Sequence, residues 1–99
     1  MTISEFQKRI EEIYFDRDKA RGRDATFVWF VEEVGELARA LKRPSDPDGA
    51  NLREEFADVL AWLSTLASIA GVDLEEAARE KYERGCPKCR AAPCRCSPS

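Results

Sequence analysis

Apolar residues recur at three- and four-residue steps along most of the chain, which is the period of an amphipathic helix. No segment alternates between apolar and polar residues as a strand does. The pattern predicts four helices: one that begins after Thr2 or Ser4 and stops at Gly22, one over residues 25–42, one over 51–70, and one that follows Asp73 and ends near residue 83. The predicted fold class is therefore all-α, with four helices.

Capping and turn residues separate the predicted helices. Asp24 and Asp73 are typical N-cap residues, and Gly71 is a natural residue just after a helix. The segment 44–49 contains two prolines and a glycine, so it predicts a loop. Because this loop is short, the helices on either side of it should be antiparallel neighbours. We expect a helical domain over residues 1–84, followed by a cysteine-bearing tail over residues 85–99.

The length of the chain limits its core. With 99 residues it is one small domain, near the size at which a single core is only marginally sufficient. Short helical chains often complete their core by association, so we expect a homodimer or a tetramer. The longest apolar run, near residues 59–63, is far too short to cross a membrane. The N-terminal residues lack the apolar stretch of a signal peptide, which favours a cytoplasmic protein.

Charge is unevenly distributed along the chain. Residues 24–58 carry nine acidic and four basic side chains, whereas residues 85–99 carry three basic side chains and no acidic one. The acidic middle of the chain would repel a nucleic-acid backbone. It would attract cations and, through them, a phosphorylated small molecule.

Two pairs of acidic residues are spaced for metal binding. Glu33 and Glu36 are three residues apart on one predicted helix, and Glu55 and Asp58 have the same spacing on the next. Residues three apart share a helix face, so each pair can direct two carboxylates at one point. Antiparallel packing would let the two pairs face each other. Oxygen ligands suit Mg²⁺, and Mn²⁺ is the alternative ion.

Asp58 lies in the most apolar stretch of the chain, between Phe56 and Leu63. We expect it to be surrounded by apolar side chains, where an unpaired carboxylate would cost several kcal/mol. A metal ion would remove this cost, and so would an ion pair with Arg39 or Arg53. The alternative for all of these acids is a solvated helix face, which is the commoner position of Glu and Asp.

A family resemblance rests on this acidic pattern. Residues 32–36 are Glu-Glu-Val-Gly-Glu, and after eighteen further residues, 55–58 are Glu-Phe-Ala-Asp. This matches the Glu-Glu-x-x-Glu…Glu-x-x-Asp signature of the MazG-like nucleoside triphosphate pyrophosphohydrolases. The segments 29–38, 70–77 and 81–84 also resemble that family, so the likeness covers about residues 5–84.

The resemblance implies a four-helix domain that hydrolyses a nucleoside triphosphate to a monophosphate and pyrophosphate with Mg²⁺. It implies that Glu33, Glu36, Glu55 and Asp58 hold the metal. It further implies that Glu32 is the catalytic carboxylate, which accepts a proton from the attacking water or orients that water. Because the chain contains no histidine, a carboxylate is the natural general base.

Basic and aromatic side chains are candidates for binding the nucleotide. Lys81 and Arg84 match basic positions of the family, and Lys42 with Arg43 is a second basic pair. They would contact the phosphates, although Lys81 and Arg84 could equally pair with neighbouring acids or with the end of their helix. The aromatic candidates for stacking on the base are Trp29, Phe30 and Trp62. Aromatic residues at helical spacing are also typical of a core.

The four cysteines lie together in the last 14 residues. Cys86 and Cys89 form a Cys-Pro-Lys-Cys turn, and Cys94 and Cys96 follow four residues later. Four thiolates can satisfy a structural Zn²⁺. Free thiols, disulfides and half-sites shared between subunits are the alternatives. The tail carries no aromatic residue on which a base could stack, so we do not expect it to bind nucleic acid.

Two functions remain open on the sequence alone. One is a Mg²⁺-dependent nucleotide pyrophosphohydrolase. The other is a non-catalytic helical interaction module with a zinc-stapled tail. Release of pyrophosphate from nucleotides would distinguish them.

Overall fold

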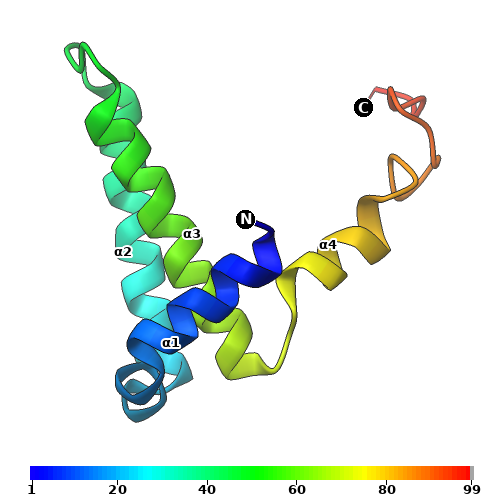
Figure 1. The fold of residues 1–99 in the computed structure, drawn as a ribbon. Coiled ribbons are helices and arrows are strands. Elements are labelled where there is room, and N and C mark those ends of the chain that lie inside the picture. Colours follow the sequence, from blue (N-terminus) through cyan, green and yellow to red (C-terminus); the bar gives the residue numbers. More distant parts are fainter. Residues whose placement is uncertain (99) are drawn as a thin grey trace.

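The computed structural model describes residues 1–98 and contains four α-helices (Figure 1). They are α1 (Ile3–Arg21), α2 (Arg23–Lys42), α3 (Ala50–Ala70) and α4 (Leu74–Tyr82). The described residues contain no strand. The all-α prediction is therefore confirmed, and so is the presence of four helices.

Local sequence signals set most of the helix ends. Thr2 caps α1 in a capping box, in which the Glu5 N–H donates to the Thr2 hydroxyl and the Thr2 N–H donates to the Glu5 carboxylate. Gly71 ends α3 with a φ of 74°, as a left-handed C-cap glycine does. Asp73 caps α4, as predicted, by accepting the N–H of Glu76 at 3.0 Å.

One capping prediction was wrong. We expected Asp24 to precede the second helix, but α2 begins at Arg23 and Gly22 occupies the cap position with a φ of 85°. The chain thus turns from α1 into α2 through a single residue, which leaves no room for a separate Asp cap. Asp24 lies in the first turn of α2 instead, where its charge complements the positive end of the helix dipole.

The helices form an open arrangement rather than a closed bundle. α2 and α3 pack side by side along their length, and α1 crosses α3 (Figure 1). α4 packs chiefly on α1 and projects away from the α2–α3 pair, carrying the tail with it. The radius of gyration is 16.2 Å, whereas a compact domain of about 100 residues has about 13 Å.

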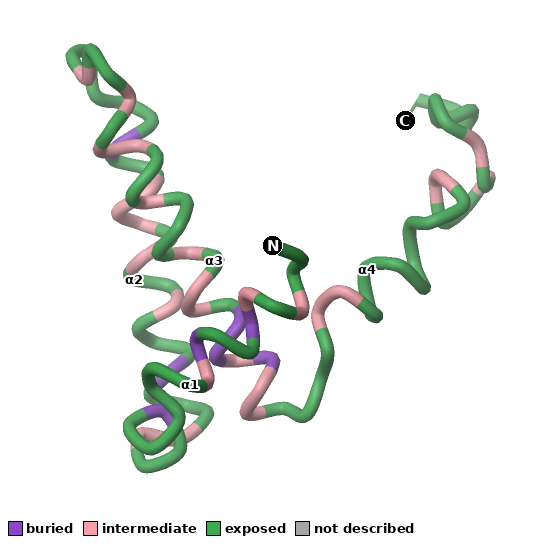
Figure 2. Tube along the Cα trace, in the orientation of Figure 1, coloured by how far each residue is buried: buried purple, intermediate pink, exposed green. Residues whose placement is uncertain are grey.

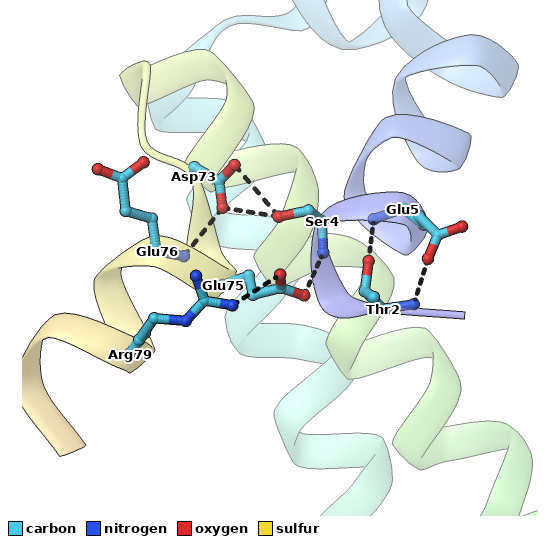
Figure 3. A network of polar contacts seen from close by, with 7 residues as sticks. All are labelled: Thr2, Ser4, Glu5, Asp73, Glu75, Glu76 and Arg79. Carbon is cyan, nitrogen blue, oxygen red and sulfur yellow. Dashed lines mark hydrogen bonds and ion pairs between the residues drawn. The ribbon is translucent and has the colours of Figure 1, made fainter. Parts of the chain in front are cut away.

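Polar contacts attach α4 to the start of α1. The buried Gln7 side chain donates to the Val72 carbonyl at 2.8 Å and to Ser68 Oγ at 3.1 Å, and its own carbonyl accepts the Leu74 N–H at 2.9 Å. Figure 3 shows the neighbouring network, in which Ser4 Oγ donates to Asp73 at 2.9 Å. Fixed by these bonds, α4 keeps its direction without an apolar core of its own.

The buried core of the single chain is small. Figure 2 shows that most of the buried segments lie where α1 crosses the other helices, with a further one toward the C-terminal end of α2. The buried apolar residues of the described chain are only Ile10, Ala40 and Ala67. The exposed large apolar side chains on α2 are Phe27, Val28, Trp29, Val31, Val34 and Leu41, and those on α3 are Phe56, Leu60 and Leu63. Monomeric proteins rarely expose so many large apolar side chains on adjacent helices.

Within residues 1–98, no single helix is both long and apolar enough to cross a bilayer. Only α3 and α4 taken together, with a bend of 95° between them, have the length and hydropathy of a membrane-spanning segment.

Candidate active site

Three carboxylates from two helices meet in the α2–α3 pair. Glu33 comes from α2, and Glu55 and Asp58 come from α3. One carboxylate oxygen of each lies within 4.8 Å of the other two. Antiparallel packing of α2 and α3 produces this arrangement, because it brings the acidic segment of one helix opposite that of the other. We refer to Glu33, Glu55 and Asp58 as the carboxylate cluster.

The expected burial of Asp58 is wrong for the single chain. Asp58 is exposed, and Phe56 beside it is 54% exposed. The apolar side chains around Asp58 face outward, because only α2 and part of α1 cover this helix. The cost of burying a lone carboxylate therefore does not argue for a metal at Asp58. The meeting of three carboxylates is the stronger argument.

Partial burial and repulsion between like charges both act on the carboxylate cluster. Partial burial, followed by the negative charges of Asp58 and Glu55, raises the pKa of Glu33 above its ordinary value of 4.5. The charges of Glu36 and Glu32 add to this effect. In addition, the buried Oε2 atom of Glu55 has no hydrogen-bond partner. A divalent cation would satisfy that oxygen and neutralise the repulsion, so the residues present fit a hard metal ion.

Two further acids of the motif lie outside the cluster. Glu36 forms an ion pair with Arg39 on the same helix. Glu32 is exposed, one residue before Glu33 on α2. Arg39 and Arg53, which we considered as partners for Asp58, bond elsewhere: Arg39 to Glu36, and Arg53 to the Asp48 carbonyl at 2.6 Å.

Two tryptophans stack one helical turn away from the carboxylate cluster. Trp29 lies four residues before Glu33, and Trp62 lies four residues after Asp58. Their rings are 6.1 Å apart between centroids, with an interplanar angle of 17°. Trp29 is 46% exposed, so it is not a core residue of the single chain.

A cavity of about 270 Å³ adjoins the cluster. Asp58 and Trp62 line it from α3, and α1 adds Tyr14, Arg17 and Arg21. The cavity thus combines two carboxylates, those of Asp18 and Asp58, with two aromatic side chains and two guanidinium groups.

The contribution of α1 to this cavity was missed in the sequence analysis. Buried Asp18 fixes Arg21 through an ion pair at 2.9 Å and accepts a hydrogen bond from Thr65 of α3 at 3.0 Å. The Arg21 guanidinium lies over the Trp62 ring, 4.9 Å from its centroid. A signal was present, because Arg17 and Arg21 are four residues apart and therefore share a helix face. The sequence could not show that this face meets the carboxylates.

The lysines and the arginine that we expected to bind phosphate lie away from the carboxylate cluster. Lys42 follows Glu33 by nine residues on α2, a rise of about 14 Å. Lys81 and Arg84 line a separate cavity of about 490 Å³ at the end of α4, together with Arg79 and Arg90. The residues lining that cavity include none of the carboxylate cluster. One chain alone therefore does not bring Lys81, Arg84 or Lys42 to the cluster.

The four thiols of the tail gather at one point. The Sγ atoms of Cys86, Cys89, Cys94 and Cys96 all lie within 4.8 Å of one another, and none of them forms a disulfide. The Arg95 N–H, followed by that of Ala91, lowers the pKa of the Cys89 thiol to about 6. The contact with Cys94 raises the pKa of Cys96 to about 11.

Comparison with known proteins places the helices in a family. Residues 21–90 match the MazG nucleotide pyrophosphohydrolase domain, a range that holds the carboxylate cluster, both tryptophans and α4. The uncharacterized protein YvdC of Bacillus subtilis (strain 168) is similar over 98 aligned residues, with 30% identity, and the alignment covers 85% of this chain and 92% of the relative. The chain belongs to the MazG nucleotide pyrophosphohydrolase family.

Proposed function

We propose that this protein hydrolyses a nucleoside triphosphate to a nucleoside monophosphate and pyrophosphate, in a reaction that depends on Mg²⁺. The observation that carries the proposal is the carboxylate cluster, in which the buried Glu55 Oε2 lacks a hydrogen-bond partner, beside a cavity with two arginines and a tryptophan. Membership of the MazG family supports the same reaction. The nucleotide pool of the cytoplasm is the proposed setting.

Glu33, Glu55 and Asp58 would hold the metal directly, and Mn²⁺ could replace Mg²⁺ because both accept oxygen ligands. Glu36 would join them after leaving its exposed ion pair with Arg39, which costs little because such pairs contribute only about 0–1 kcal/mol. When bound, the ion supplies Lewis-acid chemistry, which neutralises charge on the phosphoryl oxygens and makes water a better nucleophile.

The remaining side chains bind the nucleotide and move a proton. Arg17 and Arg21 face the cavity beside Asp58, where guanidinium groups suit phosphate oxygens. Trp29 and Trp62 offer an aromatic surface for the base, one helical turn from the cluster. Glu32 accepts a proton from the attacking water as the bond between the α and β phosphates breaks and pyrophosphate leaves.

Association of two or more copies would complete this site. The exposed apolar side chains of α2 and α3 would then become buried, as the small core of the single chain requires. α4 projects away from its own α2–α3 pair, so Lys81 and Arg84 could reach the cluster of a neighbouring copy. We therefore include a homodimer or a tetramer in the proposal.

The test is pyrophosphate release from a panel of ribonucleoside and deoxyribonucleoside triphosphates with Mg²⁺. We expect release by the unmodified chain and a loss of at least about 100-fold in Glu36→Gln and Asp58→Asn, because each removes a carboxylate held for the metal. Glu54→Gln is the matched control, since Glu54 is an exposed neighbour of Glu55 outside the cluster. Activity that survives both substitutions would refute the site. No release with any nucleotide would favour the interaction module.

A further inference from the structure

The tail has a defined shape without an apolar core to hold it. Beyond α4, the described residues 83–98 form no helix and none of them is buried. Their only apolar side chains other than cysteine and proline are Ala91 and Ala92. Because so short a segment buries little apolar surface, burial cannot offset the conformational entropy that it loses on folding. Another interaction must therefore order it.

The backbone of this segment folds into a tight knuckle around Cys86. The Arg90 N–H donates to the Cys86 carbonyl at 2.6 Å, and the Cys86 N–H donates to the Ala91 carbonyl at 3.0 Å. Arg90 adopts a φ of 60°, a left-handed conformation that a side chain other than glycine rarely takes. Gly85 has a φ of 112°, and a Cβ there would lie 2.8 Å from the Ala91 backbone. Such conformations persist only where the surroundings enforce them.

The sulfur positions match a tetrahedral thiolate site. Cys86 Sγ lies 3.6 Å from Cys96 Sγ, and Cys89 Sγ lies 3.9 Å from Cys94 Sγ. A tetrahedron with Zn–S bonds of about 2.3 Å has edges of about 3.8 Å. Backbone N–H groups already point at two of the sulfurs: that of Arg95 at Cys89, and that of Cys96 at Cys94, at 3.2 and 3.3 Å. Such outer bonds orient metal ligands and stabilise thiolates.

We propose that Cys86, Cys89, Cys94 and Cys96 bind one Zn²⁺ in a closed, structural site. Four protein thiolates leave no position for water or substrate, so the ion would order the tail rather than take part in catalysis. Two disulfides would need only pairwise proximity, whereas here all four sulfurs converge. The family match ends at residue 90 and so contains only Cys86 and Cys89, whereas Cys94 and Cys96 lie beyond the matched range.

The zinc site also has a structural consequence for the end of α4. The knuckle contributes Gly85, Cys86, Pro87 and Arg90 to the basic cavity that Lys81 and Arg84 line from the other side. An ordered knuckle therefore keeps one wall of that cavity in place. Loss of the ion would release the wall while leaving the helices intact, because α4 is attached to α1 and to the end of α3 by Gln7 and Ser4.

The test is the metal content and thiol reactivity of the full chain purified under reducing conditions. We expect one zinc per chain by elemental analysis, and four cysteines that react with a thiol reagent only after a strong chelator removes the ion. Co²⁺ replacement should give the intense visible absorption of a tetrahedral thiolate site. After chelation, limited proteolysis should cut within residues 83–99 while the far-ultraviolet circular dichroism of the helices is unchanged.

Matched variants separate a built site from adventitious zinc. Cys94→Ser should weaken Zn²⁺ binding by more than about 100-fold. Removal of even a hydrogen-bond partner of a metal ligand typically lowers metal affinity by about 10–100-fold. Gly85→Ala should also weaken it, because the added Cβ would collide with the Ala91 backbone. Lys88→Gln, in the same turn but without a ligand atom, should keep the ion. Four freely reactive thiols in the unmodified chain after addition of Zn²⁺ would overturn the proposal, and so would equal zinc binding by Cys94→Ser.

Discussion

The ionisation of Glu33 is disfavoured by its place in the carboxylate cluster. Its pKa is raised, first by partial burial and then by Asp58 and Glu55, so the folded chain binds this proton more tightly than the unfolded chain does. The resulting stability is fully present below pH 4.5 and is lost as the pH rises through the folded-state pKa. Without metal, the contribution of Glu33 to the unfolding free energy should therefore fall as the pH rises above 4.5.

The substitution Glu33→Gln tests this electrostatic account. At neutral pH without metal, the variant should be more stable by roughly 0.5 kcal/mol, the size of a like-charge pair on a helix. Mg²⁺ at about 100 times its Kd should stabilise the unmodified chain by about 2.7 kcal/mol and the variant by much less. Urea denaturation with and without Mg²⁺ measures both effects. Equal stabilisation by Mg²⁺ of Glu33→Gln and of the control Glu54→Gln would contradict a role for Glu33 in metal binding.

The ion pair between Glu36 and Arg39 gives a second prediction. In the metal-free chain Arg39 competes with the metal for Glu36, so Arg39→Gln should tighten Mg²⁺ binding by up to about fivefold, the equivalent of a surface ion pair. Isothermal titration of Mg²⁺ measures the change. Arg53→Gln is the control, because Arg53 bonds to the loop before α3 and not to an acid of the motif. Weaker binding in Arg39→Gln would show that Glu36 is not a metal ligand.

Sequence spacing predicted the carboxylate cluster only in part. Helical periodicity correctly placed Glu33 on one helix, with Glu55 and Asp58 on the next, and the short loop placed the two helices together. It could not predict that Glu36 would turn to Arg39, because side-chain pairing depends on rotamers that spacing does not fix. The burial argument for Asp58 failed because apolar neighbours in sequence can face solvent in a single chain.

At the scale of helices, Gln7 is one of two residues of α1, with Ser4, whose polar contacts hold α4 in place. Its side-chain amide uses both donor and acceptor groups, to the end of α3 and to the first residue of α4. Gln7→Ala would leave the Leu74 N–H and the Val72 carbonyl without these partners, at a cost of about 2 kcal/mol. Hydrogen exchange should quicken in α4 and less so in α2. Lys8→Ala, an exposed neighbour, should change stability by no more than about 0.5 kcal/mol.

Helix boundaries were predictable where a residue acts on the backbone of its own turn, through a capping side chain or a left-handed conformation. Thr2, Gly71 and Asp73 mark helix ends by local hydrogen bonds or by a left-handed conformation, and these signals are present in the sequence. The crossing of α1 over α3 has no such local signal. As a result, the cavity beside Asp58 could not be predicted, because Arg17 and Arg21 reach it only through that packing.

At the scale of the whole molecule, the open shape and the small core are the basis on which we propose association of several copies. Val31, which is 51% exposed on α2, belongs to the apolar surface that association would cover. We expect sedimentation velocity to show a dimer or a tetramer, and Val31→Glu to shift it toward the monomer while far-ultraviolet circular dichroism keeps its helical signal. Arg9→Glu, on an exposed position of α1, is the control for added negative charge. A chain that sediments as a monomer at all concentrations would contradict this prediction.

We propose that the carboxylate cluster serves cleavage between the α and β phosphates of a nucleotide. The most direct measurement is phosphorus-31 nuclear magnetic resonance of the products formed from a nucleoside triphosphate with Mg²⁺. We expect equimolar nucleoside monophosphate and pyrophosphate from the unmodified chain and from Glu54→Gln, and neither product from Asp58→Asn. Formation of nucleoside diphosphate and free phosphate, or the same products at the same rate from Asp58→Asn, would contradict it.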